Sequence, residues 1–288
     1  MPGAVTIARG AVAWLTPTVA EDAFRRWQGF VGIVMLGYLV VRAPVLVRAS
    51  ASWDPVGVLA LLDGPLPRWI LVASWVFALV ASGVLTAGRG GRSAAGMLAG
   101  AAVVLFTHRS SGGQILWFDV LPTLHVLILA AGAALQPAGR FDGRVAGWSM
   151  RLAALATVAT YVVAGVAKLR IGGLDWVADG ILERHIAFSA MRLEVLGGTP
   201  SPLAAPLLDL GLASAPLAVT VLVIELGAPV ALVHRRAAIV WSVAAWTMHA
   251  GIAATMFVVF HWPLFGAAFA PLVLLYAGQD SPAASRSA

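Results

Sequence analysis

Apolar stretches long enough to cross a bilayer recur along this chain of 288 residues. A membrane-spanning helix needs about 20 predominantly apolar residues. Hydrophobic residues make up 60% of the chain and charged residues only 11%, whereas charged residues make up about 25% of a typical soluble domain. Because the backbone groups of a span must be hydrogen-bonded within the protein, the spans are expected to be helices. The sequence therefore predicts an all-α integral membrane protein.

The apolar stretches predict a polytopic transmembrane helical bundle of about eight spans. They cover residues 27–47, 69–87, 93–107, 115–135, 145–168, 212–233, 237–260 and 262–277. The third is short and rich in alanine and glycine, which suits a helix buried between its neighbours. The last two are separated only by His261 and a Trp-Pro pair. We expect one transmembrane domain over residues 1–279, followed by a short flexible tail over residues 280–288.

The net charge of +6 arises from arginines in short loops, a pattern that favours membrane orientation over nucleic-acid binding. Pairs of arginines at the start and in alternate loops mark one face; they are Arg25 and Arg26, Arg89 and Arg92, Arg140 and Arg144, and Arg235 and Arg236. Positively charged loops are retained in the cytoplasm. Both termini are therefore predicted to be cytoplasmic.

Several classes of chemistry are excluded by the residues present. The chain has no cysteine, which excludes disulfides, thiolate metal sites and iron–sulfur clusters. Its six histidines are scattered, so we expect no metal site. There is no nucleophile-elbow, phosphate-loop or zinc-protease motif. Any redox chemistry must therefore be carried by a substrate or cofactor.

The longest polar interruption, residues 170–211, begins with an amphipathic stretch. Its apolar side carries Trp176, Ile181 and Ile186, and its polar side carries Glu183 and Arg184. This pattern predicts a helix that lies in the membrane interface and caps the external ends of the spans, over a water-free ligand pocket. A plain extracellular loop is the alternative.

Lys168 is the only lysine in the chain. A desolvated lysine, unlike arginine, can lose its proton and act as a base near neutral pH. Tyr161, Gly165 and Lys168 share one helix face, and Gly165 would let a flat ring approach the backbone. The alternative is a lysine that reaches from a helix end to the lipid headgroups.

Ionisable residues inside the predicted spans are further site candidates, because charges at membrane depth are costly. They are Asp119, His125, Arg151, Glu225 and His249. Pro229 follows Glu225 by four residues and is expected to disrupt the helix there. The alternative role of Glu225 is a structural ion pair with an arginine such as Arg42 or Arg151.

His249 lies on a helix face with Ser242, Trp246 and Met256. One interpretation is that His249 exchanges a proton in a pocket whose floor is formed by Trp246 and Met256. The other is that it makes an interhelical hydrogen bond.

Two blocks carry a family resemblance. Residues 161–180 read YVVAGVAKLRIGGLDWVADG, and a second block, VLVIELGAP, contains Glu225 and Pro229 and is followed by a basic turn and the helix of His249. In these blocks, and over residues 24–277, the chain resembles the vitamin K-dependent gamma-carboxylase family and its bacterial relatives with the horizontally transferred transmembrane (HTTM) domain. Ala167 stands where a carboxylase has a second lysine.

The resemblance implies a membrane enzyme of the lyase or monooxygenase type, in the bacterial cytoplasmic membrane. Lys168 would be the catalytic base that deprotonates a reduced vitamin K or menaquinol-like naphthoquinone. Reaction with O2 would convert the quinone to an epoxide and drive proton abstraction from a substrate carbon, with CO2 as a candidate co-substrate. The candidate quinone-binding residues are Tyr161, Gly165, Trp176, Glu225, Trp246, His249 and Met256, with His125 and Asp119 as candidates for a second acid or base.

A non-catalytic protein is the competing interpretation. It would be a quinone- or lipid-binding membrane protein or a small transporter, in which Lys168 pairs with Asp175 or a lipid headgroup. In either case the expected partners are membrane lipids and quinone. An enzyme would also take an unidentified small-molecule or peptide substrate.

Overall fold

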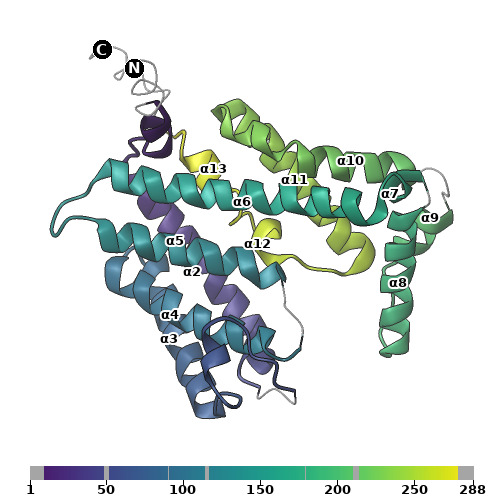
Figure 1. The fold of residues 1–288 in the computed structure, drawn as a ribbon, viewed down its shortest axis with the longest axis horizontal. Helices are drawn as coiled ribbons and strands as arrows, with labels where there is room; N and C mark the ends of the chain where they lie inside the picture. Colours follow the sequence, from purple (N-terminus) through teal and green to yellow (C-terminus); the bar gives the residue numbers. More distant parts are fainter. Residues whose placement is uncertain are drawn as a thin grey trace. The chain divides into compact units, whose positions relative to one another are not determined.

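A computed structural model describes residues 10–48, 52–89, 91–113, 117–178, 180–209 and 214–277. Every regular element in these ranges is helical, which confirms the all-α prediction (Figure 1). Within them, four helices are long and apolar enough to cross a membrane: α2 (Glu21–Leu46), α3 (Arg68–Thr86), α6 (Gly143–Gly172) and α11 (Arg235–Met256). The chain is thus an integral membrane protein. The predicted tail over residues 280–288 lies outside the described residues.

The other predicted spans are shorter, less apolar or interrupted helices. They are α4 (Gly91–Ser110), α5 (Val120–Leu135), α10 (Ser214–Leu226), α12 (His261–Leu264) and α13 (Ala270–Leu274). The α4 helix has 20 residues, but glycine, serine and two basic residues dilute its apolar ones. The α10 helix ends at Leu226 and a 3-10 helix, η4 (Ala228–Leu232), follows. This break agrees with the disruption expected from Pro229.

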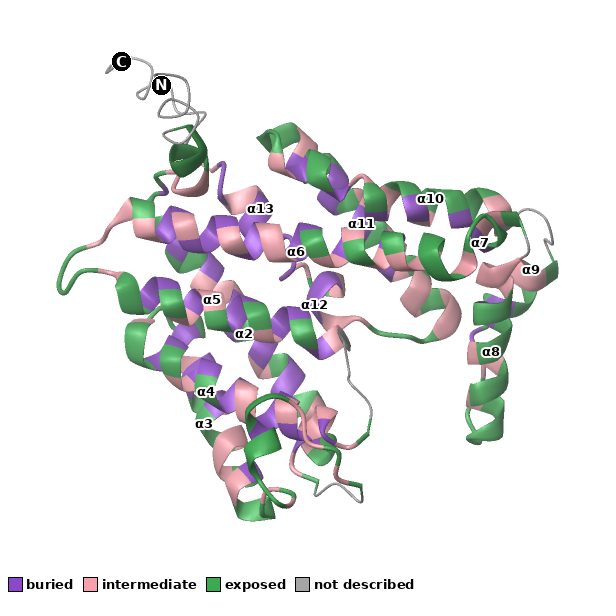
Figure 2. Ribbon diagram, viewed as in Figure 1, coloured by how far each residue is buried: buried purple, intermediate pink, exposed green. Residues whose placement is uncertain are grey.

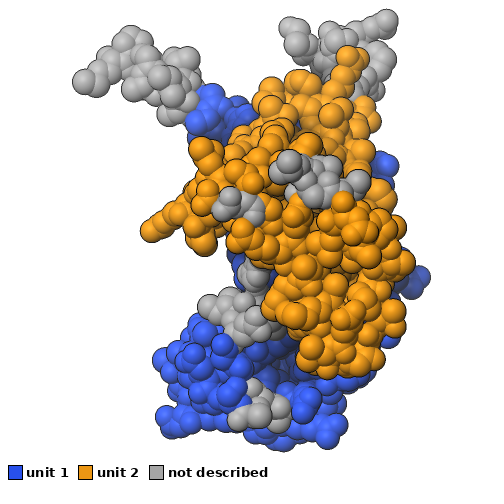
Figure 3. Space-filling model, turned by 90° about the vertical axis from the view of Figure 1, so that its right-hand side faces the viewer, with its two compact units in different colours: residues 1–156, 270–288 blue, residues 157–269 orange. Residues whose placement is uncertain are grey.

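The chain divides into two compact units (Figure 3). Unit 1 comprises residues 1–156 and 270–288, and unit 2 comprises residues 157–269. The first half of α6 belongs to unit 1 and its second half to unit 2. The single domain predicted over residues 1–279 stays a prediction.

In unit 1, α2 packs on α3, α3 on α4, and α4 on α5. A 3-10 helix, η1 (Gly57–Leu61), lies between α2 and α3, and a second, η2 (Trp117–Asp119), precedes α5. Gly32 brings α2 close to α3, because a Cβ added there would lie 2.8 Å from the Ser82 carbonyl oxygen. Small residues let membrane helices approach closely, where lipid provides no hydrophobic drive for association.

The outward faces of the long helices are apolar as well. Buried residues form stripes along the helices, with exposed residues between them (Figure 2). Exposed apolar side chains include Val41, Trp69, Phe77 and Val240. A helix that is apolar all round is typical of a membrane span, so these faces are suited to contact lipid.

Unit 2 contains the segment for which an amphipathic helix is predicted. It forms two helices, α7 (Asp175–Ala178) and α8 (Ile181–Val195), separated at Gly180, whose φ is +64°. Glycine adopts this left-handed conformation without steric cost. The α7 helix packs on α10 through Trp176, and α8 contacts α9 (Ala204–Asp209), α10 and α11. That this segment lies in the membrane interface stays a prediction.

Phe257, which ends α11, is a non-glycine residue in the left-handed region, with φ +53°. Phe257→Gly is expected to stabilise the protein by about 0.5–1 kcal/mol, because the left-handed conformation costs a non-glycine residue about 1–2 kcal/mol and glycine loses part of that gain to chain entropy. The Phe257 side chain is 50% exposed, so little packing is lost.

The measurement is the midpoint of detergent-induced unfolding, followed by circular dichroism. Phe265→Gly is the matched control, because Phe265 is similarly exposed but has an ordinary φ of −87°. The control should lower the midpoint. A Phe257→Gly midpoint below that of the unaltered protein would show that the backbone strain is not significant.

Candidate functional site

Lys168 and Glu225 form an ion pair within unit 2. Lys168 Nζ, on α6, donates a hydrogen bond to Glu225 Oε1, on α10, over 2.5 Å. Their side chains are 22% and 6% exposed. Two alternatives considered from the sequence are therefore corrected: Lys168 pairs with Glu225 and not with Asp175, and the ion-pair partner of Glu225 is this lysine in place of an arginine. The only lysine of the chain is directed into the protein, toward a carboxylate.

Gly165 makes this pairing possible by letting α10 approach α6. A Cβ added at Gly165 would lie 2.9 Å from Leu226 Cδ2 and 3.1 Å from Glu225 Cβ. The space beside Gly165, expected from the sequence to accommodate a flat ring, is filled by these two side chains of α10. The role of Gly165 in this structure is thus helix packing one turn from Lys168.

The Trp176 ring also lies near the lysine ammonium group. Lys168 Nζ is 5.3 Å from the centre of the Trp176 ring, a distance at which the ring attracts a cation. Trp176 is 9% exposed, and its Nε1 has no hydrogen-bond partner among the described residues. The ammonium group therefore has both a carboxylate and an aromatic ring near it, with limited access to solvent.

Tyr161 and His249 form a second polar contact in unit 2. The Tyr161 hydroxyl and His249 Nε2 are 2.7 Å apart and link α6 to α11. Both residues are buried, at 5% and 9% exposure. The Tyr161 ring meets Trp241 edge to face at 4.9 Å, and the His249 ring lies 5.1 Å from that of Phe260. This contact confirms that His249 makes an interhelical hydrogen bond.

The two contacts belong to one group of residues, here called the α6 polar cluster: Tyr161, Lys168, Trp176, Glu225 and His249. Tyr161 and Lys168 are seven residues apart on one face of α6, about 10 Å along its axis. The charge of Glu225 acts on Tyr161, and that of Lys168 acts on His249. The structure thus brings together five residues singled out from the sequence.

Three buried polar atoms of the α6 polar cluster have no hydrogen-bond partner among the described residues. They are Glu225 Oε2, His249 Nδ1 and Trp176 Nε1. Buried polar groups are nearly always hydrogen-bonded, so such atoms require an explanation. The carboxylate oxygen can accept a hydrogen bond, the indole can donate one, and the imidazole can do either. The cluster therefore retains hydrogen-bonding capacity for a ligand with hydroxyl or carbonyl groups.

Trp246 and Met256 lie apart from these contacts. Trp246 is 46% exposed, and its Nε1 donates to the Leu264 carbonyl oxygen over 2.8 Å. Met256 is the last residue of α11 and is only partly buried. The exposed position of Trp246 does not fit the floor of a closed pocket beside His249.

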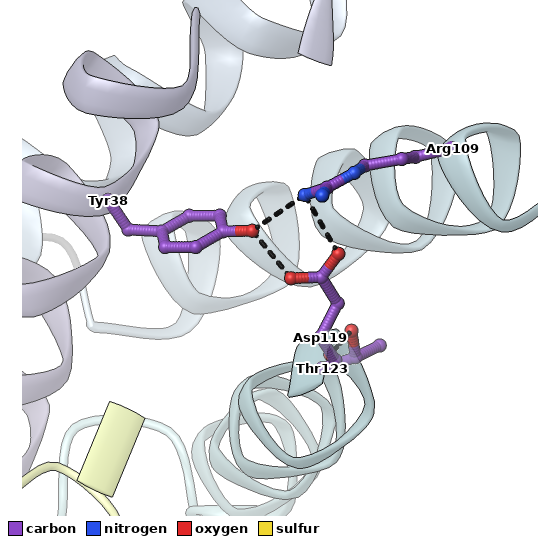
Figure 4. A network of polar contacts seen from close by, with 4 residues as sticks. All are labelled: Tyr38, Arg109, Asp119 and Thr123. Atoms are coloured by element: carbon purple, nitrogen blue, oxygen red, sulfur yellow. Dashed lines mark hydrogen bonds and ion pairs between the residues drawn. The ribbon is translucent and has the colours of Figure 1, made fainter. Parts of the chain in front are cut away.

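Asp119 and His125, the candidates for a second acid or base, lie in unit 1 and have partners there. Asp119 accepts hydrogen bonds from the Tyr38 hydroxyl at 2.5 Å and from Arg109 Nη1 at 3.1 Å (Figure 4). His125 is fully buried and is hydrogen-bonded to the backbone of Ala153. Both residues are thus engaged within unit 1, and their proposed second role stays untested.

Neither Tyr38 nor Arg109 was predicted as a functional residue. Their sequence separation from Asp119 is 81 and 10 residues. The sequence signal that could have pointed to them was Asp119, an acidic residue at the start of a predicted span. A charge at membrane depth needs a partner, and a cationic side chain such as that of Arg109 provides one.

No group of three or more histidine, aspartate and glutamate side chains is placed to hold a metal ion within the part of the chain that the structure describes. The α6 polar cluster offers one carboxylate, one imidazole and one lysine. These side chains are of the types that exchange protons.

Comparisons with known proteins identify no relative of this chain. No protein-family model, no curated protein and no solved structure matches it. The resemblance to the carboxylase family rests on the two sequence blocks that contribute Tyr161, Lys168, Trp176, Glu225 and His249.

Proposed function

We propose that the chain is a membrane enzyme of the HTTM and gamma-carboxylase type, which epoxidises a reduced naphthoquinone with O2 and couples this to proton abstraction from a second substrate. The observation that carries the proposal is the part-buried contact of 2.5 Å between Lys168 and Glu225, with the Trp176 ring 5.3 Å from the ammonium group. A lysine that can pass its proton to a neighbouring carboxylate in a desolvated site is suited to act as a base.

The residues of the α6 polar cluster fit a reduced naphthoquinone chemically. Such a molecule has two hydroxyl groups on a flat apolar ring system. The unpartnered atoms of Glu225, His249 and Trp176 can bind hydroxyl groups, and aromatic rings surround Tyr161 and His249. When bound, the reduced quinone supplies an acidic hydroxyl and the electrons that reduce oxygen.

The residues of the chain would hold and move the proton. In the ion pair, Lys168 carries the proton and is not basic. Transfer of that proton to Glu225 along the hydrogen bond leaves a neutral amine, which accepts the proton of a quinol hydroxyl. The Tyr161 hydroxyl and the His249 imidazole, which contact each other, offer a second place for proton transfer.

We also propose that the chain crosses the membrane about eight times. The shorter helices α4, α5 and α10, and the α12–α13 segment, would complete the transmembrane bundle. The α7–α8 segment would lie in the external interface, and both termini would be cytoplasmic, in a bacterial cytoplasmic membrane. The alternating arginine pairs support this orientation. Cysteine labelling of introduced sites in the loops would test it.

The test of function is epoxide formation by protein purified into lipid nanodiscs. A menaquinol analogue is added under O2, and its epoxide is measured by mass spectrometry. Lys168→Arg is expected to lower the rate at least about 100-fold, because arginine keeps its proton and general acid–base catalysis contributes about 10²–10⁴-fold. Arg170→Gln, an exposed change two residues along α6, should leave the rate unchanged. No epoxide from the unaltered protein, or an unchanged rate in Lys168→Arg, would contradict the proposal.

The same ion pair also favours a second candidate, a non-catalytic quinone- or lipid-binding protein or a small transporter. Glu225 neutralises Lys168 within unit 2 and joins α10 to α6, a role that requires no reaction. Quenching of tryptophan fluorescence by the menaquinol analogue, without epoxide formation, would favour binding over catalysis.

A further inference from the structure

Unit 1 contains a cluster with more positive than negative charge, here called the arginine cluster: Tyr38, Arg42, Arg109, Phe118 and Asp119. We propose that it binds a phosphate group, from either an anionic phospholipid headgroup or a soluble phosphate. This inference is independent of the function proposed for the α6 polar cluster.

The hydrogen bonds of the arginine cluster occupy its one carboxylate. Asp119 Oδ1 accepts from Tyr38, and Oδ2 accepts from Arg109 Nη1, which also donates to the Tyr38 hydroxyl over 3.1 Å (Figure 4). Each carboxylate oxygen thus has one partner, and the two arginines exceed the carboxylate by one positive charge. The Asp119 carboxylate and the Tyr38 hydroxyl both accept hydrogen bonds from Arg109 and hold its side chain in place.

Arg42 is the arginine of the cluster that has no ion pair with this carboxylate. Its charge acts on Asp119, but the ion pair of Asp119 is made by Arg109. Arg42 Nε is buried and has no hydrogen-bond partner among the described residues. A buried guanidinium donor without an acceptor is costly. A phosphate oxygen would supply the missing acceptor.

The Phe118 ring lies near both guanidinium groups. The Cζ atoms of Arg42 and Arg109 lie 6.0 Å and 5.3 Å from the centre of its ring. Stacking of this kind limits the freedom of an arginine side chain before a ligand binds. The charges of both arginines act on Tyr38 and Asp119, so an anion bound in the arginine cluster would be attracted by both. Arginine forks match the geometry of phosphate oxygens.

The position of the arginine cluster along its helices suits a headgroup. Arg42 lies four residues before the end of α2, about 6 Å along the helix axis. Arg109 is the next-to-last residue of α4, and Asp119 directly precedes α5. Because α2 and α3 can span a membrane, residues near their ends lie at the depth of lipid phosphates. A lipid phosphate is therefore expected at the level of the arginine cluster.

Binding is tested on delipidated protein in a nonionic detergent. The probes are phosphatidylglycerol in mixed micelles, followed by native mass spectrometry, and inorganic phosphate, followed by calorimetry; phosphatidylcholine is the zwitterionic comparison. Arg42→Gln is expected to weaken binding at least about tenfold, since a hydrogen bond to a charged group contributes about 1.5–3 kcal/mol. Arg48→Gln is the matched control, because Arg48 is an exposed arginine beyond the same end of α2.

The two probes distinguish the source of the phosphate. Binding of phosphatidylglycerol alone identifies a lipid headgroup, whereas binding of inorganic phosphate identifies a soluble anion; both support the site if Arg42→Gln weakens them and Arg48→Gln does not. Arg42→Lys, which keeps the charge, should retain part of the affinity and verify folding. The proposal is overturned if neither probe binds, if phosphatidylcholine binds equally well, or if Arg42→Gln and Arg48→Gln behave alike.

Discussion

Lys168→Met is expected to destabilise the protein more than Glu225→Gln, although both changes break the same ion pair. Lys168→Met leaves a carboxylate that is only 6% exposed, whereas Glu225→Gln leaves an ammonium group that is 22% exposed and keeps the Trp176 ring beside it. Removing one partner of a buried pair costs about 3–5 kcal/mol. We expect the lower end of this range for Lys168→Met and a smaller loss for Glu225→Gln.

The double variant Lys168→Met/Glu225→Leu should recover most of the lost stability. Replacing both members of a buried pair with apolar residues is often neutral or stabilising, and the surroundings on α6 and α10 are apolar. The measurement is the free energy of unfolding in mixed micelles, arranged as a double-mutant cycle with Lys168→Met and Glu225→Leu as the single variants and Arg170→Gln as the control. A double variant that loses the sum of the two single losses would show that the pair does not couple α6 to α10.

Gly147→Ala is expected to prevent unit 1 from packing as described. A Cβ at Gly147 would lie 1.6 Å from the Pro17 carbonyl oxygen, and one at Gly143 would lie 2.7 Å from that of Val19. The two glycines are one turn apart on α6, and the preceding segment crosses them, with Val19 N bonded to Gly143 O over 3.0 Å. The clash is with backbone, so no rotamer change relieves it. Overpacking costs about 1–3 kcal/mol, and occasionally more.

The expected result is a large fall in the yield of monodisperse protein, or an unfolding free energy lowered by at least about 3 kcal/mol. Gly100→Ala is the matched control, because Gly100 lies within α4 and nothing is within 4 Å of the added Cβ. There the higher helix propensity of alanine should leave stability unchanged or raise it by up to about 1 kcal/mol. Equal behaviour of the two variants would contradict the close crossing at Gly147.

The residues of the α6 polar cluster could be selected from the sequence, but not their pairing. Lys168 stands out as the only lysine, and Glu225 and His249 as ionisable groups in apolar helices. Helix periodicity relates Tyr161 to Lys168 because both lie on α6. It carries no information about which residues of α10 and α11 face them, since that depends on how the helices are rotated and offset. The Lys168–Glu225 and Tyr161–His249 contacts were therefore found only in the structure.

Two features that organise unit 1 were missed. Gly143 and Gly147 have the small-residue spacing of a close helix crossing, yet a short N-terminal segment, rather than another span, crosses them. Tyr38 was an unremarked aromatic residue of a span until its hydroxyl was found on Asp119. In both cases the partner comes from a distant part of the sequence, and residue spacing reports only neighbours within one helix.

The sequence by itself determined that this is an all-helical integral membrane protein, because apolar stretches of span length leave the backbone no other way to satisfy its hydrogen bonds in lipid. It also determined which few residues are too polar for their surroundings. Only the tertiary structure decided that Lys168 is neutralised by Glu225, that α10 fills the space beside Gly165, and that Arg42 and Arg109 converge on Phe118. Those outcomes depend on contacts between helices, whose geometry arises from side-chain packing along the whole of each helix pair.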